Sequence, residues 1–245
     1  MIELPFARLA SLARTCSRAR RWVALVLLVG TSWVSAQTLL VPTKVHSDQV
    51  TAELLVHAPQ GIAPGNPVWL GLQLTHAPDW HTYWQNPGDS GLPTQLEWQL
   101  PTGVLAGDIG WPTPKKFPLG PLANYGYDGT VLLSVPLTIT PEFNAPKLDV
   151  GLNASWLACR KECIPEDAQL QINVPRQQPV TVNGVAFEEA LANIPKYIAN
   201  NSLKLSVKGQ FIDILWSQPP TKWHGKRLEF FPITPGLTEP GAPWT

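Results

Sequence analysis

Two of the three cysteines in the 245-residue chain stand four positions apart, at Cys159 and Cys163, and these residues are the best suited to chemistry. Two thiols at this spacing can form a disulfide if a tight loop brings their Cα atoms to roughly 4.4–6.8 Å. The closed loop would hold only about five residues, so the chain-entropy model gives it a stabilisation of roughly 2 kcal/mol. The pair is therefore either a small structural disulfide or a reversible redox couple.

The three residues between the cysteines are Arg160, Lys161 and Glu162. The two adjacent cations would stabilise a thiolate and make the pair reactive. An exposed disulfide in a short loop is also the type expected to be labile. Spacing and composition alone leave the structural and the redox alternatives open. Metal binding through the two thiols is less favoured, because no histidine lies near them in sequence to complete a site.

A second cluster of functional residue types is the aromatic segment Trp80–Gly91, which reads Trp-His-Thr-Tyr-Trp-Gln-Asn-Pro-Gly-Asp-Ser-Gly. Its alternation predicts that about half of these rings belong to the core. The others could form a sugar-stacking platform, or a lid or groove that shields the cysteines or docks a partner. His76 and His81 could bind copper, although two histidines are more often simply hydrogen-bonded.

Short strands separated by turns must position these residues. Alternating apolar and polar residues predict six of them: 51–57, 68–75, 94–100, 131–139, 148–156 and 169–174. The last two would pair as a hairpin whose connection, from about Cys159 to Asp167, places both cysteines at its tip. Strands at this spacing predict an antiparallel β-sandwich. The 26 prolines also favour β-structure with many turns.

The chain divides into three parts by composition. Residues 1–36 combine a basic start, a short apolar run and a small-residue cleavage site at Val34-Ser35-Ala36, which is typical of a secretory signal peptide. Residues 37–178 hold the sandwich. Residues 179–245 hold one helix, 187–194, and three further strands, 203–207, 211–216 and 228–231. Because these few elements can bury only a thin core, we expect a smaller, incomplete second β-domain there.

Charge and hydropathy limit the possible partners and the compartment. Residues 1–36 carry five basic residues and one acidic residue, so their removal leaves 13 basic and 17 acidic residues. No basic cluster remains, and we therefore expect no nucleic-acid binding. No later apolar segment approaches the roughly 18 residues of a membrane span, which predicts an exported chain in an oxidising compartment. No nucleophile-elbow or phosphate-loop motif is present either, and no cofactor or metal is expected.

Several motifs in order resemble those of a known family. They are Trp80–Gly91, Trp111-Pro112, Gly120-Pro121, Asn124-Tyr125-Gly126-Tyr127 and Trp156–Cys159 followed by Cys163-Ile164-Pro165. Together they resemble the N-terminal periplasmic domain of DsbD/ScsB-type thiol:disulfide interchange proteins, which are protein-disulfide reductases. The resemblance is closest to the ScsB branch, which is linked with suppression of copper sensitivity, and covers about residues 40–245.

The resemblance implies an immunoglobulin-like fold and makes Cys159 and Cys163 the exchange pair. It also implies that Arg160, Lys161 and Glu162 tune the loop. Tyr83, Trp84 and Tyr125 become candidates for shielding the pair or docking a partner.

The expected partners are periplasmic disulfide-exchange proteins and the membrane electron-transfer domain that supplies the family's electrons. The chain itself lacks membrane segments and a thioredoxin Cys-x-x-Cys motif, so we expect it to act as part of a longer membrane protein or beside one. The alternative is a non-catalytic module that binds copper or carbohydrate and carries a structural disulfide.

Overall fold

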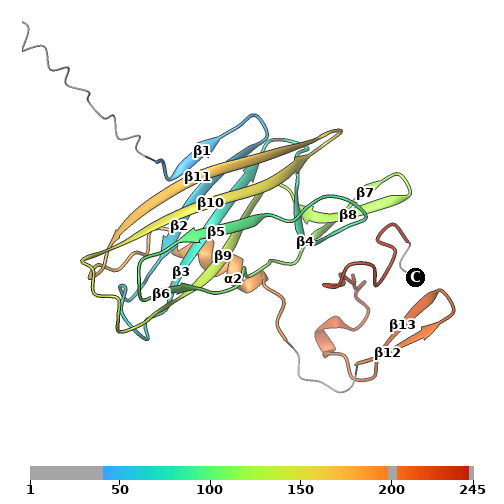
Figure 1. Ribbon diagram of the computed structural model, residues 1–245. Coiled ribbons are helices and arrows are strands. Elements are labelled where there is room, and N and C mark those ends of the chain that lie inside the picture. The colour runs from blue at the N-terminus through green and yellow to red at the C-terminus, as the bar shows by residue number, and fades with distance from the viewer. Residues whose placement is uncertain (1–40, 198–202, 243–245) are drawn as a thin grey trace, which may run out of the picture. The chain divides into compact units, whose positions relative to one another are not determined.

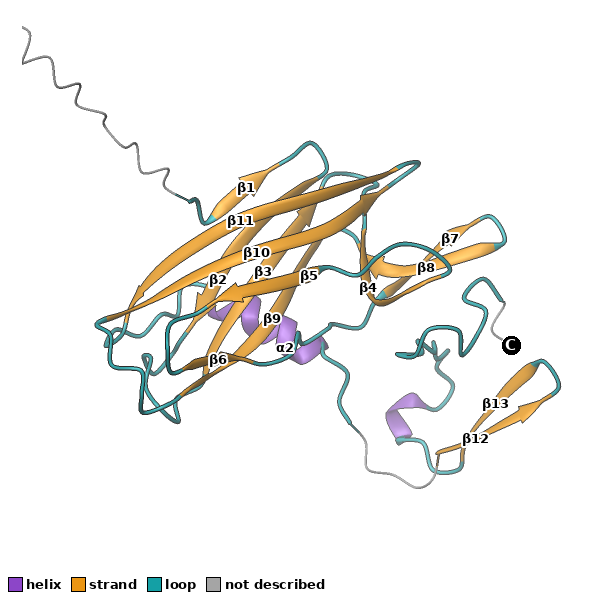
Figure 2. Ribbon diagram, in the orientation of Figure 1, coloured by secondary structure: helices purple, strands orange, loops and turns teal. Residues whose placement is uncertain are grey.

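The computed structural model describes residues 41–197 and 203–242, so the predicted signal peptide lies outside the described residues. Two antiparallel sheets face each other and form a sandwich (Figures 1 and 2). Its strands are β1 (Lys44–His46), β2 (Val50–His57), β3 (Val68–His76), β5 (Gln95–Gln99), β6 (Val104–Ala106), β9 (Thr130–Ile139), β10 (Lys147–Cys159) and β11 (Cys163–Pro175). The strand order is β1-β2-β3-β9-β6 in one sheet and β11-β10-β5 in the other.

The core lies between the two sheets. One sheet contributes side chains such as Leu72 and Leu133, and the other contributes Leu148, Leu152 and Leu170, each at most 1% exposed. Burying apolar side chains in this way is the main favourable term in folding. The all-β, immunoglobulin-like sandwich predicted from the sequence is confirmed.

The β10–β11 hairpin is the longest pairing in the sandwich. Its register runs without interruption from Lys147 opposite Pro175 to Cys159 opposite Cys163. Every second residue of β10 from Leu148 to Ala158 is buried, because alternate side chains of a strand point to opposite faces. The predicted hairpin is thus confirmed, but its turn is tighter than expected, since only residues 160–162 separate the two strands.

Helix α2 (Gly184–Asn193) packs on the outer face of the larger sheet. Phe187 is fully buried and Ala190 is 7% exposed, and they form one buried cluster with Leu55 of β2 and Leu132 of β9. The sequence places this helix with residues 179–245, whereas its apolar side chains complete the outer surface of the sandwich. The division of the chain at residue 178 stays a prediction.

A small three-stranded sheet extends from one end of the sandwich (Figure 1). Its order is β4 (Thr82–Gly88), β8 (Leu122–Tyr127) and β7 (Lys115–Leu119). The β4–β8 pairing is irregular between Tyr83 and Gly88, which indicates a β-bulge. This sheet contains most of the aromatic segment Trp80–Gly91.

The C-terminal part contains the hairpin β12 (Leu203–Lys208) and β13 (Phe211–Trp216), followed by the 3-10 turn η1 (Thr221–Trp223). Two of the three predicted C-terminal strands are therefore present. The third, 228–231, is wrong, because this segment has no strand partner. Instead, Phe231 packs edge-on against the rings of Trp84 and Tyr125.

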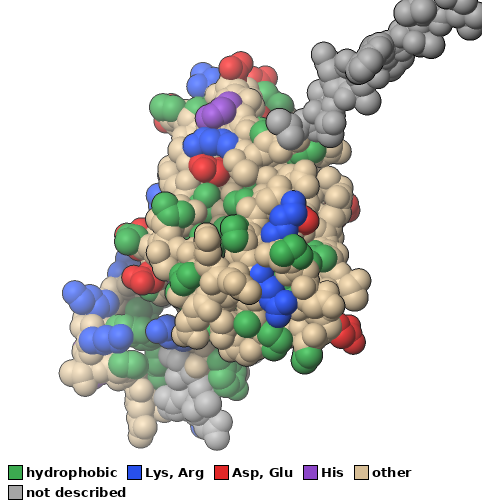
Figure 3. Space-filling view, turned by 90° about the vertical axis from the view of Figure 1, so that its left-hand side faces the viewer, with side chains coloured by type: hydrophobic (Ala, Val, Ile, Leu, Met, Phe, Trp, Pro, Cys, Tyr) green, Lys and Arg blue, Asp and Glu red, His purple; other side chains and the backbone are tan. Residues whose placement is uncertain are grey.

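The surface carries charges of both signs. On the face seen in Figure 3, basic and acidic side chains are interspersed with hydrophobic ones. Among residues 41–197 and 203–242, no helix has the length and apolar character needed to cross a membrane.

Candidate functional site

Cys159 and Cys163 form a disulfide at the tip of the β10–β11 hairpin, with their Cα atoms 4.1 Å apart. Cys159 ends β10 and Cys163 begins β11, so the two residues face each other in the strand register. The backbone N–H of Arg160 donates to the Glu162 carbonyl at 3.0 Å and closes the short turn. The hairpin thus brings the two cysteines together through its own pairing.

The two cysteines differ in their access to solvent. Cys159 is 3% exposed, although Ala158 is the last inward-facing residue of β10, and its backbone is paired with that of His81. Cys163, on the opposite strand, is exposed. Thiol attack on a disulfide depends on which sulfur can be reached. An approaching thiolate can therefore reach the sulfur of Cys163, whereas the protein covers the sulfur of Cys159.

Tyr83 contacts the exposed cysteine from β4. Its hydroxyl lies 3.6 Å from Cys163 Sγ, and because a disulfide sulfur carries no hydrogen, the hydroxyl is the donor. Burial raises the pKa of Tyr83 above its ordinary value, so the hydroxyl keeps its proton at neutral pH. The ring itself is 1% exposed, which fixes the donor in place.

His81 is joined to the buried cysteine through the backbone. The His81 N–H donates to the Cys159 carbonyl at 3.0 Å, and the Cys159 N–H donates to the His81 carbonyl at 2.9 Å. The imidazole stacks on Phe117 of β7 with ring centroids 4.5 Å apart and meets Tyr83 edge-on at 5.4 Å. Desolvation lowers the pKa of His81, so the ring is uncharged at neutral pH. These contacts attach the small sheet to the hairpin tip.

The loop cations are placed differently from each other. Arg160 lies over the ring of Trp80, with the guanidinium carbon 5.1 Å from the ring centre. Such a cation–π contact holds a charge near one position. Lys161 and Glu162 are exposed beside it. The positive charge next to the disulfide is therefore partly fixed by an aromatic side chain.

Gly91 leaves the space that the Tyr83 ring occupies. Its φ of +102° is in the left-handed region, and a Cβ atom there would lie 2.2 Å from the Tyr83 ring. The turn before it is held by side chains, because Asp89 accepts from the Ala123 N–H at 2.7 Å and Asn124 accepts from the Ser90 N–H at 3.1 Å. The Asn-Pro-Gly-Asp-Ser-Gly turn thus leaves space for the tyrosine ring.

Trp84 and Tyr125 lie away from the cysteines. They are at most 2% exposed and meet each other edge-on with ring centroids 6.4 Å apart. Both contact Phe231. Among the predicted site residues, the structure therefore brings Tyr83, Arg160, Lys161 and Glu162 to the cysteine pair and separates Trp84 and Tyr125 from it. Because all these rings are buried, they present no open platform for stacking a sugar.

His76 is occupied by hydrogen bonds at both ring nitrogens. Nδ1 lies 2.8 Å from the Gly129 carbonyl, to which it donates, and Nε2 lies 2.9 Å from the Thr82 hydroxyl, from which it accepts. Burial lowers the pKa of His76 and keeps it neutral. Over the described part of the chain, no group of three or more His, Cys, Asp or Glu residues is arranged to hold a metal ion.

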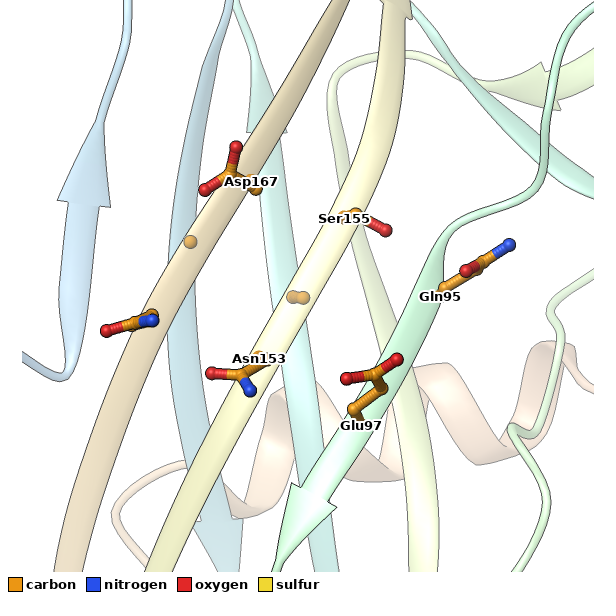
Figure 4. Close-up of a pocket in the computed structure, with 8 residues that line it drawn as sticks. Gln95, Glu97, Asn153, Ser155 and Asp167 are labelled. Carbon is orange, nitrogen blue, oxygen red and sulfur yellow. The ribbon is translucent and has the colours of Figure 1, made fainter.

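A shallow hollow of about 250 Å³ lies on the outer face of the smaller sheet (Figure 4). It is lined by alternate, outward-facing residues of β5, β10 and β11: Gln95, Glu97, Asn153, Ser155, Asp167 and Gln169, with Ala154 and Ala168 at its floor. It does not include the cysteines. The exposed Cys163 lies instead at the tip of the hairpin.

Sequence reasoning missed three residues of the site. Phe117 gives no signal, because Lys-Lys-Phe-Pro-Leu has neither a clear strand period nor a reactive side chain. The sequence predicts His81 only as a possible copper ligand and places Trp80 among the candidate core rings. Its spacing offers a signal for His81, since it stands two positions before Tyr83 and would share its side of an extended segment.

The chain was compared with protein families and with known proteins. A family model described as thiol:disulfide interchange protein DsbD, N-terminal, matches residues 43–175. The crystal structure of the N-terminal periplasmic domain of ScsB from Proteus mirabilis is similar, with a TM-score of 0.49 and 19% sequence identity. The match covers 69% of this chain and 65% of that one, just under two thirds of its length. No match was found among curated proteins.

Proposed function

The chain belongs to the family of DsbD N-terminal domains, and we propose that it passes reducing equivalents to exported proteins by thiol–disulfide exchange at Cys159 and Cys163. The observation that carries this proposal is the disulfide at the hairpin tip, which has one exposed and one buried cysteine. A pair of this kind can meet a partner disulfide with one sulfur and keep the other in reserve.

In the proposed reaction, the reduced Cys163 attacks first. Its thiolate displaces one sulfur of the partner disulfide, which leaves as a thiolate and takes up a proton, and a mixed disulfide forms. The Cys159 thiol then loses its proton and attacks Cys163 Sγ, which releases the second partner sulfur. Two electrons and two protons pass to the partner, and the Cys159–Cys163 disulfide is restored. A dithiol of another domain or chain must reduce it again.

Three features of the tip support this chemistry: a hydrogen-bond donor, a fixed positive charge and the exposed charges of the loop. The Tyr83 hydroxyl would donate to the Cys163 thiolate, as it does to the disulfide sulfur at 3.6 Å. Hydrogen bonds to charged groups are the stronger ones. Arg160, fixed over Trp80, adds a positive charge nearby, and Lys161 and Glu162 set the charge that a partner meets. All three contributions favour the thiolate or guide the approach.

Trp84 and Tyr125 act behind the site in this proposal. They support β4 and β8 and do not shield the sulfur atoms. The partners we propose are exported proteins with exchangeable disulfides and, as the electron donor, a membrane electron-transfer domain of the same family. Their encounter takes place outside the cytoplasm, where the predicted signal peptide would deliver the chain.

Trapping separates the two cysteines. The Cys159→Ala protein should accumulate a mixed disulfide with a model protein disulfide, because Cys163 can attack but nothing resolves the product. The Cys163→Ala protein should accumulate little, because the remaining thiol is buried. Both are detected as mass-shifted species on non-reducing gels. If the Cys159→Ala protein traps no partner and the reduction potential of the wild-type pair lies well below about −300 mV, the disulfide is structural and the proposal is rejected.

A further inference from the structure

The small sheet β4–β8–β7 has two sides with different contacts. On one side, Tyr83 reaches Cys163 and Phe117 stacks on His81, next to Cys159. On the other side lies a C-terminal segment, Phe231–Ala242, which we call the strap (dark red in Figure 1). Neighbouring residues of a strand point to opposite sides of the sheet. The same three strands therefore contact the cysteine pair on one side and the strap on the other.

The first end of the strap is seated on aromatic rings. Phe231 meets Tyr125 edge-on with ring centroids 5.2 Å apart, and Trp84 at 6.3 Å. Edge-on aromatic pairs of this kind stabilise a contact beyond the area that they bury. The Asn86 amide, 2% exposed, donates to the Pro232 carbonyl at 2.8 Å. A buried, satisfied amide of this kind fixes the position of the strap backbone against β4.

The rest of the strap reaches the other two strands. The side chain of Thr238 hydrogen-bonds to Tyr125 of β8. Lys116 of β7 donates to the Ala242 carbonyl at 3.1 Å. Gly241 lies so close to the β7–β8 turn that a Cβ atom there would be 2.0 Å from the Pro121 carbonyl oxygen. The strap therefore contacts β4, β8 and the β7 end of the sheet.

We propose that the strap is a positioning element for the cysteine pair, an inference that rests on the exchange function proposed above. Trp84 and Asn86 hold the strap, and Tyr83, on the same strand, holds Cys163. Docking of the strap fixes β4 and so keeps the Tyr83 hydroxyl at the sulfur. Release of the strap lets β4 shift and loosens that hydrogen bond. The chain beyond β13 thereby controls how fast the disulfide exchanges.

The test measures reduction of the wild-type disulfide by dithiothreitol in the chain that contains the strap. A dithiothreitol thiolate attacks Cys163 Sγ and releases Cys159 as a thiolate. The second dithiothreitol thiol then forms the oxidised ring, so two electrons and two protons enter the pair. The rate is followed by alkylation and mass spectrometry. Phe231→Ala removes the aromatic seat, and Ile233→Ala, at a side chain that is 67% exposed in the same strap, is the matched control.

We expect Phe231→Ala to change the reduction rate by at least about threefold and Ile233→Ala to leave it within about 1.5-fold. A double-mutant cycle shows whether the effect passes through the tyrosine. In a Tyr83→Phe background, Phe231→Ala should change the rate little further. Thr238→Val removes one hydrogen bond to Tyr125 and should give a smaller change in the same direction. If circular dichroism shows that the Phe231→Ala protein is unfolded, the Thr238→Val protein replaces it in the test, and a changed reduction rate is again the expected result.

An unchanged rate in a folded strap variant overturns the inference, as does full additivity with Tyr83→Phe. A lower melting temperature alone indicates a purely structural contact and also overturns it. The exchange function fails separately, if the wild-type pair reduces no protein disulfide. In that event the strap effect on dithiothreitol reduction stands by itself, since it does not need a protein partner.

Discussion

The Tyr83 hydroxyl donates a hydrogen bond to Cys163 Sγ at 3.6 Å, although the two residues lie 80 positions apart in the chain. The contact links the small sheet to the tip of the hairpin. Under the proposed function, the reactivity of the exposed sulfur depends through this contact on side chains that do no chemistry themselves. The predictions that follow test this dependence and the scaffold around it.

Gly91→Ala should displace the Tyr83 ring. The new methyl group would overlap the ring at 2.2 Å, and overpacking typically costs about 1–3 kcal/mol of unfolding free energy. We expect that loss in urea denaturation and a changed rate of disulfide reduction by dithiothreitol. Gly129→Ala is the control, because its φ of +61° brings the backbone cost but nothing lies within 4 Å. Equal effects of the two substitutions on the rate contradict the prediction.

Arg160→Gln should slow reduction of the disulfide by glutathione, which is anionic, by about threefold. It should slow reduction by neutral 2-mercaptoethanol less, because the fixed guanidinium attracts a negative reactant. The difference should vanish at 1 M salt, where the Debye length is about 3 Å. Lys161→Gln removes the same charge from an exposed side chain with no aromatic support and should have the smaller effect. If Arg160→Gln slows reduction by glutathione and by 2-mercaptoethanol by the same factor, the result argues against electrostatic guidance.

The stability of the protein should fall as the pH is lowered below 6.5, the ordinary pKa of histidine. Burial lowers the pKa of His76, so the unfolded chain binds a proton at a pH where the folded chain does not. Unfolding then takes up a proton, and stability rises with pH through the window below 6.5. Below the lowered pKa of His76, the loss of unfolding free energy due to this residue is complete. Denaturation with urea at pH 7.5 and 5.5 measures it.

His76→Gln is the matched variant, since an amide can keep a hydrogen bond to Gly129 or Thr82 without titrating. It should lose less stability than the wild type between the two pH values. His81 has a pKa lowered by the same cause and contributes the part that remains. An identical loss in the variant assigns the pH dependence to other groups.

Phe187→Ala should destabilise the sandwich by about 3–5 kcal/mol, as expected for a buried phenylalanine. Phe187 is fully buried against Leu55 and Leu132. Val185→Ala, at a side chain of the same helix that is 70% exposed, should change the free energy of unfolding by less than about 0.5 kcal/mol. A small effect of Phe187→Ala shows that the helix is not part of the folded core.

The hairpin that carries the cysteines was predictable because its residues obey one rule over its whole length. From Leu148 onward, every second residue of β10 is apolar and buried. The placement of the helix was not predictable in this way. Leu55 and Leu132 interrupt the alternation of their strands and become buried only because Phe187 covers them. Periodicity shows which residues are buried together within a strand but not which distant element covers them.

The small sheet is the part that sequence reasoning missed. Its strand β4 contains Asn86 and Pro87, and a bulge follows Tyr83, so no regular period remains to identify it. The contact between Tyr83 and Cys163 depends on this irregular geometry. Resemblance to a family identified Tyr83 as a candidate, but only the fold shows that it reaches the sulfur, whereas Trp84 and Tyr125 support the opposite side.

The cross-link at the hairpin tip joins two strands that are already paired along their full length, from Lys147 opposite Pro175 onward. Breaking it frees a loop of about five residues, and the chain-entropy model gives this at most roughly 2 kcal/mol. Folding and oxidation state are therefore weakly linked thermodynamically. The oxidised and dithiol forms should have nearly the same shape and similar unfolding free energies. Under the proposed function, the free energy of the disulfide is then available for transfer to another protein and is not committed to keeping this one folded.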